Sequence, residues 1–199
     1  MKIRIKLLED MLGTASANPD IHREYIASKA PDANGIEEEV AAVGVDPVME
    51  KAMTVFPRSP DGKPIMWDYQ VKGFLKEATG IVIDLLDEEV KVAKTKLSKF
   101  THKRFVDNFI FVSPRMIPIQ GEMGLPCTRP LRATTMQGDR VALATSETIK
   151  AGAIIECEIK ILVPSLEPVI RKCLDYGALK GLGQWRNSGK GIFSWEEVS

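Results

Sequence analysis

The sequence is poor in the residues from which metal sites and disulfide frameworks are built. Its 199 residues include two histidines and three cysteines. Because Cys127, Cys157 and Cys173 are odd in number and far apart, they predict neither disulfides nor a Cys-x-x-Cys zinc site, and we interpret all three as packing residues. No carboxylate-histidine cluster has metal-site spacing. The sequence therefore predicts no metal and no cofactor.

Long hydrophobic runs are also lacking. No window approaches the ~18 consecutive apolar residues of a membrane span. The first residues, Met1-Lys2-Ile3-Arg4-Ile5-Lys6, alternate charge with apolar side chains, unlike a secretory signal. We therefore expect a cytoplasmic protein with no membrane partner. With 44% hydrophobic residues, the chain can bury one substantial core, which predicts a single domain over residues 1–199.

The net charge is zero, but the charges are unevenly distributed. Residues 1–50 contain 5 Lys or Arg and 10 Asp or Glu, whereas residues 91–140 contain 10 and 3. Within the basic region, residues 91–105 carry six cations, no acid and two aromatics. Such a segment attracts phosphates, although a solvated helix face would have a similar composition. Its candidate contacts are Lys94, Lys96 and Lys99.

A glycine-rich run, Leu179–Phe193, carries the strongest functional signal. Glycines let main-chain N–H groups approach an anion, cations neutralise it, and an indole stacks on a base. The alternative is a tight turn with a tryptophan anchored in the core. Position 186 is arginine where a dinucleotide fingerprint needs glycine, and Gly191 follows Lys190 where a P-loop needs Ser or Thr. The candidate residues are Lys180, Gly181, Gly183, Trp185, Arg186, Gly189, Lys190 and Gly191.

Hydrophobic periodicity predicts an α+β protein. Alternation predicts a strand at Lys2–Leu8, and i, i+3, i+4 spacing predicts a helix at Tyr69–Thr79 that continues to Val90, with Gly80 a candidate interruption. Short helices are expected within 19–31 and 36–43, and a loop-rich insertion at 31–68, with at most a short helix at 47–53. Further strands are expected at 105–112, 128–134, 140–144, 153–163 and 192–198, with a helix from Ser165 to Gly177. This order permits a ferredoxin-like antiparallel sheet with helices on one face.

The order of elements, with Val71-Lys72-Gly73-Phe74-Leu75-Lys76 early and the glycine-rich run late, resembles the CRISPR-associated RAMP superfamily. Members build CRISPR effector backbones and process guide RNA. In that superfamily a Lys-Gly segment opens the first long helix and a glycine-rich loop before the last strand contacts RNA, which implies an RNA contact at Lys72 and an RRM-like fold. The chain lacks a second ferredoxin-like half, and its short loops leave little room for a long thumb. It therefore resembles a stand-alone relative of the kind that a phage would encode.

These observations favour a non-catalytic module that binds single-stranded RNA, or DNA, and assembles along the strand. Arg115, Arg129, Arg132 and Arg140 fall on or beside predicted strands, where several could project from one sheet face. One alternative is a protein-binding module: a decoy that inserts into a CRISPR effector complex, or a protein that self-assembles by pairing acidic residues 37–39 of one copy with basic residues 91–104 of the next. Another is a metal-independent endoribonuclease that uses His22 or His102.

Overall fold

A computed structural model describes residues 1–17, 53–86, 89–92, 95–135 and 138–198. The helices expected within 19–31, 36–43 and 47–53 lie outside these residues, apart from Met53. So do His22, the acidic residues 37–39 and Lys94.

The main sheet is antiparallel and is built around the N-terminal strand. β1 (Lys2–Leu7) lies between β13 (Ile154–Ile161) and β14 (Phe193–Val198), which confirms the three strands predicted in these parts of the sequence. On its other side β13 pairs with two short strands, and β5 extends the sheet from one of them. These outer strands are β8 (Ile110–Ser113), β9 (Met116–Gln120) and β5 (Ile65–Trp67).

One face of this sheet is buried and the other is polar. Ile3, Ile5 and Leu7 are each at most 1% exposed, because alternate residues of a strand point to the same face. On the opposite face, Arg4 bridges its two neighbouring strands through Glu156 (2.6 Å) and Glu196 (2.8 Å). This confirms the prediction of a sheet with one buried face.

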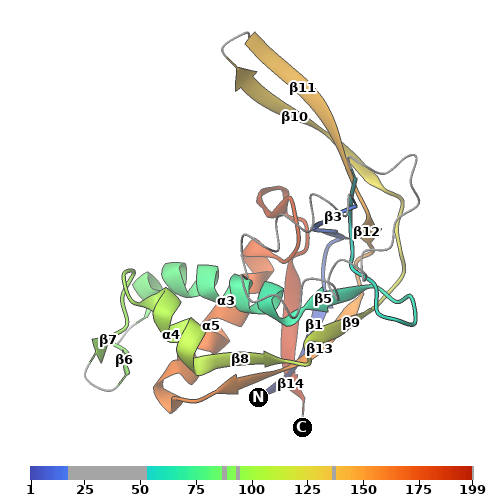
Figure 1. Ribbon diagram of the computed structural model, residues 1–199. Helices are drawn as coiled ribbons and strands as arrows, with labels where there is room; N and C mark the ends of the chain where they lie inside the picture. Colours follow the sequence, from blue (N-terminus) through green and yellow to red (C-terminus); the bar gives the residue numbers. More distant parts are fainter. Residues whose placement is uncertain (18–52, 87–88, 93–94, 136–137, 199) are drawn as a thin grey trace.

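Three helices pack with the buried face into one core, and Figure 1 shows α3 and α5 running side by side. α3 (Asp68–Val82) confirms the predicted helix, and Gly80 does not interrupt it. A 3-10 turn follows at Ile83–Leu85 and Leu86 is extended, so the expected continuation to Val90 is wrong. The other two helices are α4 (His102–Phe109) and α5 (Glu167–Lys180).

Two predictions near these helices are wrong. Residues 105–109 belong to α4, because His102, Phe105 and Val106 follow helical spacing and bury one side of a helix. Residues 53–55 and 65–67 form strands where loops were expected. Ile65, Met66 and Trp67 are all buried, so this short strand is packed on both of its faces.

A long β-hairpin projects from the body (Figure 1). We call it the arm; it consists of β10 (Cys127–Thr135) and β11 (Gly138–Ser146), paired along nine residues each. The strands predicted at 128–134 and 140–144 lie within it. At its base β11 pairs with β4 (Met53–Val55), which pairs with β3 (Ala15–Ser16).

Two short ladders complete the described strands. Beside the arm, β12 (Thr148–Ile149) pairs with β2 (Met11–Leu12). Near the C-terminal end of α3, β6 (Lys91–Val92) pairs with β7 (Thr95–Lys96). No helix among the described residues is both long and apolar enough to span a membrane.

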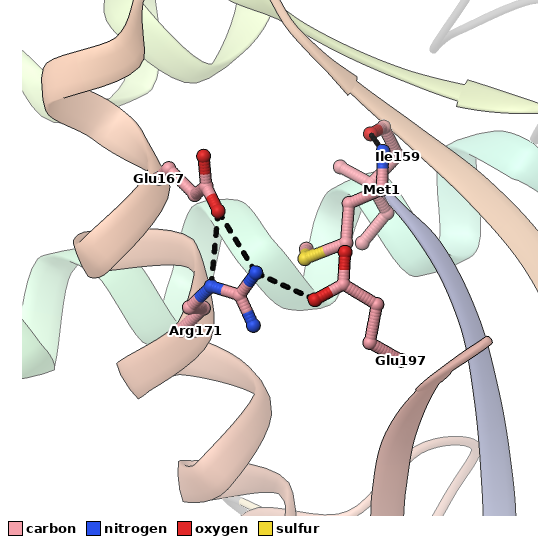
Figure 2. Close-up of polar contacts among 5 residues, drawn as sticks. All are labelled: Met1, Ile159, Glu167, Arg171 and Glu197. Atoms are coloured by element: carbon pink, nitrogen blue, oxygen red, sulfur yellow. Dashed lines mark hydrogen bonds and ion pairs between the residues drawn. The ribbon is translucent and has the colours of Figure 1, made fainter. Parts of the chain in front are cut away.

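Arg171 links α5 to the last strand through hydrogen bonds, as Figure 2 shows. Its guanidinium donates to Glu167 one turn earlier (2.8 and 3.1 Å) and to Glu197 on β14 (2.6 Å). The hydrogen bonds to Glu197 and Glu167 raise the pKa of Arg171 above its ordinary value. Nearby, the Met1 amine donates to the Ile159 carbonyl at 3.1 Å.

Gly177 fixes how closely α5 approaches β14. A methyl group at this position would overlap the Phe193 ring, which is fully buried and packs edge-on against Phe74 of α3 at 5.4 Å between centroids. The sequence suggested that Gly177 ends the helix. Instead α5 continues to Lys180, and Gly181, with φ of 74°, ends it.

Two helical glycines provide a matched test of this packing. Gly177→Ala should lower the free energy of unfolding by about 1–3 kcal/mol, because the added methyl overpacks the core. Gly73→Ala, on the exposed side of α3 with open space around the new methyl, should raise it by about 0.5–1 kcal/mol. Urea denaturation measures both. Equal stability of the two variants would contradict the close approach of Gly177 and Phe193.

Candidate nucleic-acid interface

The glycine-rich loop, residues 181–191, connects α5 to β14 and is closed at its neck. The Leu182 amide donates to the Gly191 carbonyl, and the Gly191 amide donates to the Asp10 carbonyl, each at 2.8 Å. A side chain on Gly181 or Gly191 would collide with the main chain of the opposite side of the neck. These two glycines therefore hold the loop closed.

The loop glycines do not present a row of free amides to a phosphate. The amides of Gly181 and Gly189 donate to Gly177 (3.1 Å) and Arg186 (3.0 Å), and that of Gly191 is also engaged. Gly183 lies against the Leu12 carbonyl, which a methyl group would approach to 2.6 Å. The chemistry that the loop offers to a ligand thus lies mainly in its side chains.

Trp185 is the most prominent of these side chains. Its backbone is left-handed, with φ of 55°, a conformation that costs a non-glycine residue about 1–2 kcal/mol. The indole is nevertheless 43% exposed, so burial of the ring does not compensate for this backbone cost. Strained backbone of this kind is often found at binding sites.

Arg129, from the base of the arm, lies beneath this indole. Its guanidinium carbon is 5.2 Å from the centre of the Trp185 ring, a cation-π contact. Arg129 is only 8% exposed, and one nitrogen, Nη2, donates to Gln184 Oε1 at 2.9 Å. Among the residues that the structure describes, Nε and Nη1 have no hydrogen-bond partner and the guanidinium has no carboxylate partner. A buried cation thus keeps two donors unused.

The remaining cations of the loop are paired with acids. Glu77 of α3 accepts from Arg186 at 2.8 Å and lies 3.3 Å from Lys180, while Lys190 lies 3.6 Å from Asp10. Partial burial favours the neutral form of Glu77, but the hydrogen bonds and charges of Arg186 and Lys180 outweigh it. They lower the pKa of Glu77 below its ordinary value. Glu77 therefore competes with any anion for these cations.

The structure does not bring Lys72 to the loop. Lys72 lies on the side of α3 that faces α4, where its amine donates to the Asp107 carbonyl (3.0 Å) and covers the Phe111 ring (4.8 Å). Partial burial lowers its pKa.

The basic segment also lies away from the loop, near the other end of α3 (Figure 1). Lys96 pairs with Glu89, and Lys99 pairs with Asp84 at 2.6 Å. These two lysines therefore carry acidic partners of their own.

Of the four predicted strand arginines, Arg115 and Arg129 lie at different places in the structure. The Arg115 guanidinium lies 5.3 Å from the Trp67 ring, at the start of α3, whereas Arg129 lies under Trp185. Arg132 and Arg140 lie on β10 and β11 of the arm, and their side chains are outside the described part of the structure.

His102 is held inside the protein. It is 8% exposed, its Nδ1 lies 2.9 Å from the Lys99 carbonyl, and Gly80 faces its ring. Because a carbonyl only accepts, Nδ1 carries the proton of this bond. Among the described residues, no group of three His, Cys, Asp or Glu is arranged to hold a metal. Burial raises the pKa of the Cys157 and Cys173 thiols to about 12, and both pack in the core.

Comparison with known proteins gives a fold relation. No protein-family model and no curated protein matches the sequence. One chain of the cryo-EM structure of the type III-B Cmr-β complex bound to cognate target RNA superposes with a TM-score of 0.52 and 10% identity, over 100% of this chain and 58% of that one. The fold is similar to that of a CRISPR-complex chain. A chain of a type IV-B CRISPR complex gives 0.49 and 11%, over 100% of this chain and 90% of that one. The present chain thus spans little more than half of the first relative.

Sequence reasoning missed the long-range partners of the loop. Glu77 and Gln184 carry no motif, and Tyr69 and Trp67 were not considered as part of a site. Glu77 reaches Arg186 of the loop, and Gln184 reaches Arg129 of the arm, through contacts 109 and 55 residues apart in the sequence. Contacts between such distant segments leave no local pattern in the sequence.

The unused donors of Arg129 predict an unusual stability effect. Arg129→Met should raise the free energy of unfolding by about 1 kcal/mol. The substitution removes two buried donors that lack acceptors, and this gain is larger than the loss of the cation-π contact. Arg171→Met serves as the control and should lower stability, because Arg171 loses bonds to two carboxylates. Urea denaturation measures both. A loss of 2 kcal/mol or more in Arg129→Met would mean that the guanidinium is structurally satisfied.

Proposed function

We propose that this protein is a non-catalytic module that binds single-stranded nucleic acid, RNA rather than DNA, through the glycine-rich loop. The observation that carries the proposal is the buried Arg129 guanidinium with two unused donors beneath the exposed, strained Trp185. A base would stack on the exposed indole, and the positive charge of the buried guanidinium beneath it would attract the phosphates of the strand. Similarity to a chain of an RNA-bound CRISPR complex supports RNA as the ligand.

We further propose that the chain is a stand-alone member of the RAMP superfamily, as a phage would encode, that acts in the cytoplasm. The strand order β14-β1-β13-β8, with α3 and α4 between β1 and β8 and α5 between β13 and β14, supports a ferredoxin-like arrangement. The arm supports assembly along a strand, because it extends beyond the body, where a neighbouring copy or an effector subunit would meet it first.

Fluorescence anisotropy with single- and double-stranded RNA and DNA at two salt concentrations tests this function. We expect single-stranded RNA to bind best, and Trp185→Ala to weaken binding by about 1–3 kcal/mol, fivefold to over a hundredfold. Arg129→Met should weaken it as well, and urea denaturation checks that this variant is folded. The control is Trp195→Phe, because Trp195 donates to Asp175 on the α5–β14 side. Parent-like affinity in both loop variants would remove the loop from the interface.

Removal of the competing acid should have the opposite effect. Glu77→Gln frees Arg186 and Lys180 for phosphates, so it should raise the affinity for single-stranded RNA several-fold and steepen its salt dependence. Glu196→Gln is the matched control, because it removes the same charge from a pair on the sheet face. Equal gains in both variants would indicate a general charge effect and not a contact at the loop.

The two alternatives are separated by simple outcomes. Labelled single-stranded RNA should stay intact with and without divalent metal, and His22→Ala and His102→Ala should bind like the parent. Defined fragments that vanish in either histidine variant would establish an endoribonuclease. Co-purification of an effector subunit without any binding of oligonucleotides would establish the decoy.

A further inference from the structure

A pocket of about 430 Å³ lies next to the glycine-rich loop. Three separate parts of the chain form it: the first two turns of α3, the β3–β4 ladder, and residues 182, 183 and 186 of the loop. Figure 1 shows these parts meeting between the helices and the base of the arm. Because Arg186 belongs to both the pocket and the loop, a strand bound at the loop passes the mouth of the pocket.

The pocket has the chemistry of a site for a planar, uncharged ring. Apolar walls come from Met66, Trp67, Phe74 and Leu182. Tyr69, 41% exposed, stacks on the Trp67 ring with centroids 6.4 Å apart and planes within 10°. A third planar ring can stack on a pair of parallel aromatic rings of this kind.

The polar groups around the pocket are neutral, apart from one cation. Gln70 accepts from the Trp67 amide (2.8 Å) and donates to Thr14 (2.6 Å), which leaves its second amide hydrogen for a ligand. Among the described residues that line the pocket, none is acidic and only Arg186 is charged. These walls favour a neutral ring, and an anion attached to the ring would compete with Glu77 for Arg186, which together is the composition of a nucleotide.

Gly73 keeps the pocket open at a cost to α3. It lies inside the helix, where glycine in place of alanine lowers the equilibrium constant for helix formation roughly fivefold. No atom lies within 4 Å of the position that its Cβ would take, so packing does not require a glycine here. At Gly177 and Gly183, by contrast, a methyl would collide with neighbouring atoms. Because Gly73 has no side chain, the pocket beside it stays open.

We propose that this pocket receives one nucleobase of the bound strand, stacked on Tyr69 and hydrogen-bonded by Gln70, with its phosphate near Arg186. The inference rests on the proposed function, because the strand at the loop delivers the base. It adds a site that reads a base to a loop that holds the backbone.

The test fills the pocket without disturbing the fold. Gly73→Leu places a side chain in the open space, and Ala178→Leu, on the exposed side of α5, is the matched control. Two probes of equal length are compared by anisotropy: a uridine oligoribonucleotide and the same ribose-phosphate chain without bases. We expect Gly73→Leu to weaken binding of the uridine probe at least fivefold and to leave the abasic probe unchanged. Ala178→Leu should match the parent with both.

Each other outcome contradicts a specific claim. Parent-like binding of the uridine probe by Gly73→Leu, or an equal loss with both probes, would overturn the base pocket while the loop stays in place. A parent protein that binds neither probe would overturn the proposed function, and the pocket with it. Tyr69→Ala provides a second measurement, and should reproduce the selective loss of the uridine probe.

Discussion

Phe193 is the contact on which the rest of the site depends. Its ring lies against Gly177 of α5 and meets Phe74 of α3 edge-on, so one side chain joins the last strand to two helices. The glycine-rich loop begins and ends within a few residues of this contact. Its two ends are therefore held by the core, although its side chains lie at the surface. Phe74 also lines the pocket, so the same packing sets the position of both candidate contacts.

Charge pairing divides the cations near the loop into two kinds. Arg186, Lys180 and Lys190 already have carboxylate partners, so an incoming phosphate exchanges one anion for another and gains little from them. Arg129 is already buried in the folded protein. Among the described residues, two of its hydrogen-bond donors have no acceptor. No carboxylate in the described part of the chain pairs with its guanidinium, so it differs from the three paired cations around the loop.

The sequence predicted best what depends on neighbours along the chain. The alternation in β1 and β13, the apolar stripe of α3 and the composition of the glycine-rich loop are local, and the elements predicted from them are present. It failed where the outcome depends on distant packing: a strand was predicted across residues 105–109, which belong to α4, and a loop was predicted where β5 forms. The candidate site follows the same division. Trp185 and Arg186 were found from their loop, whereas the roles of Glu77, Tyr69 and Gly73 depend on how α3 is placed.

The three tryptophans occupy three different environments, and this gives the protein a built-in optical probe. Trp67 is fully buried, Trp195 is partly buried and hydrogen-bonded to Asp175, and Trp185 is exposed above a guanidinium. The emission of Trp185 should therefore be the most red-shifted of the three and the first to respond to collisional quenchers. A base that stacks on this indole would quench its emission directly. Occupation of the loop can thus be followed with unlabelled protein and unlabelled nucleic acid.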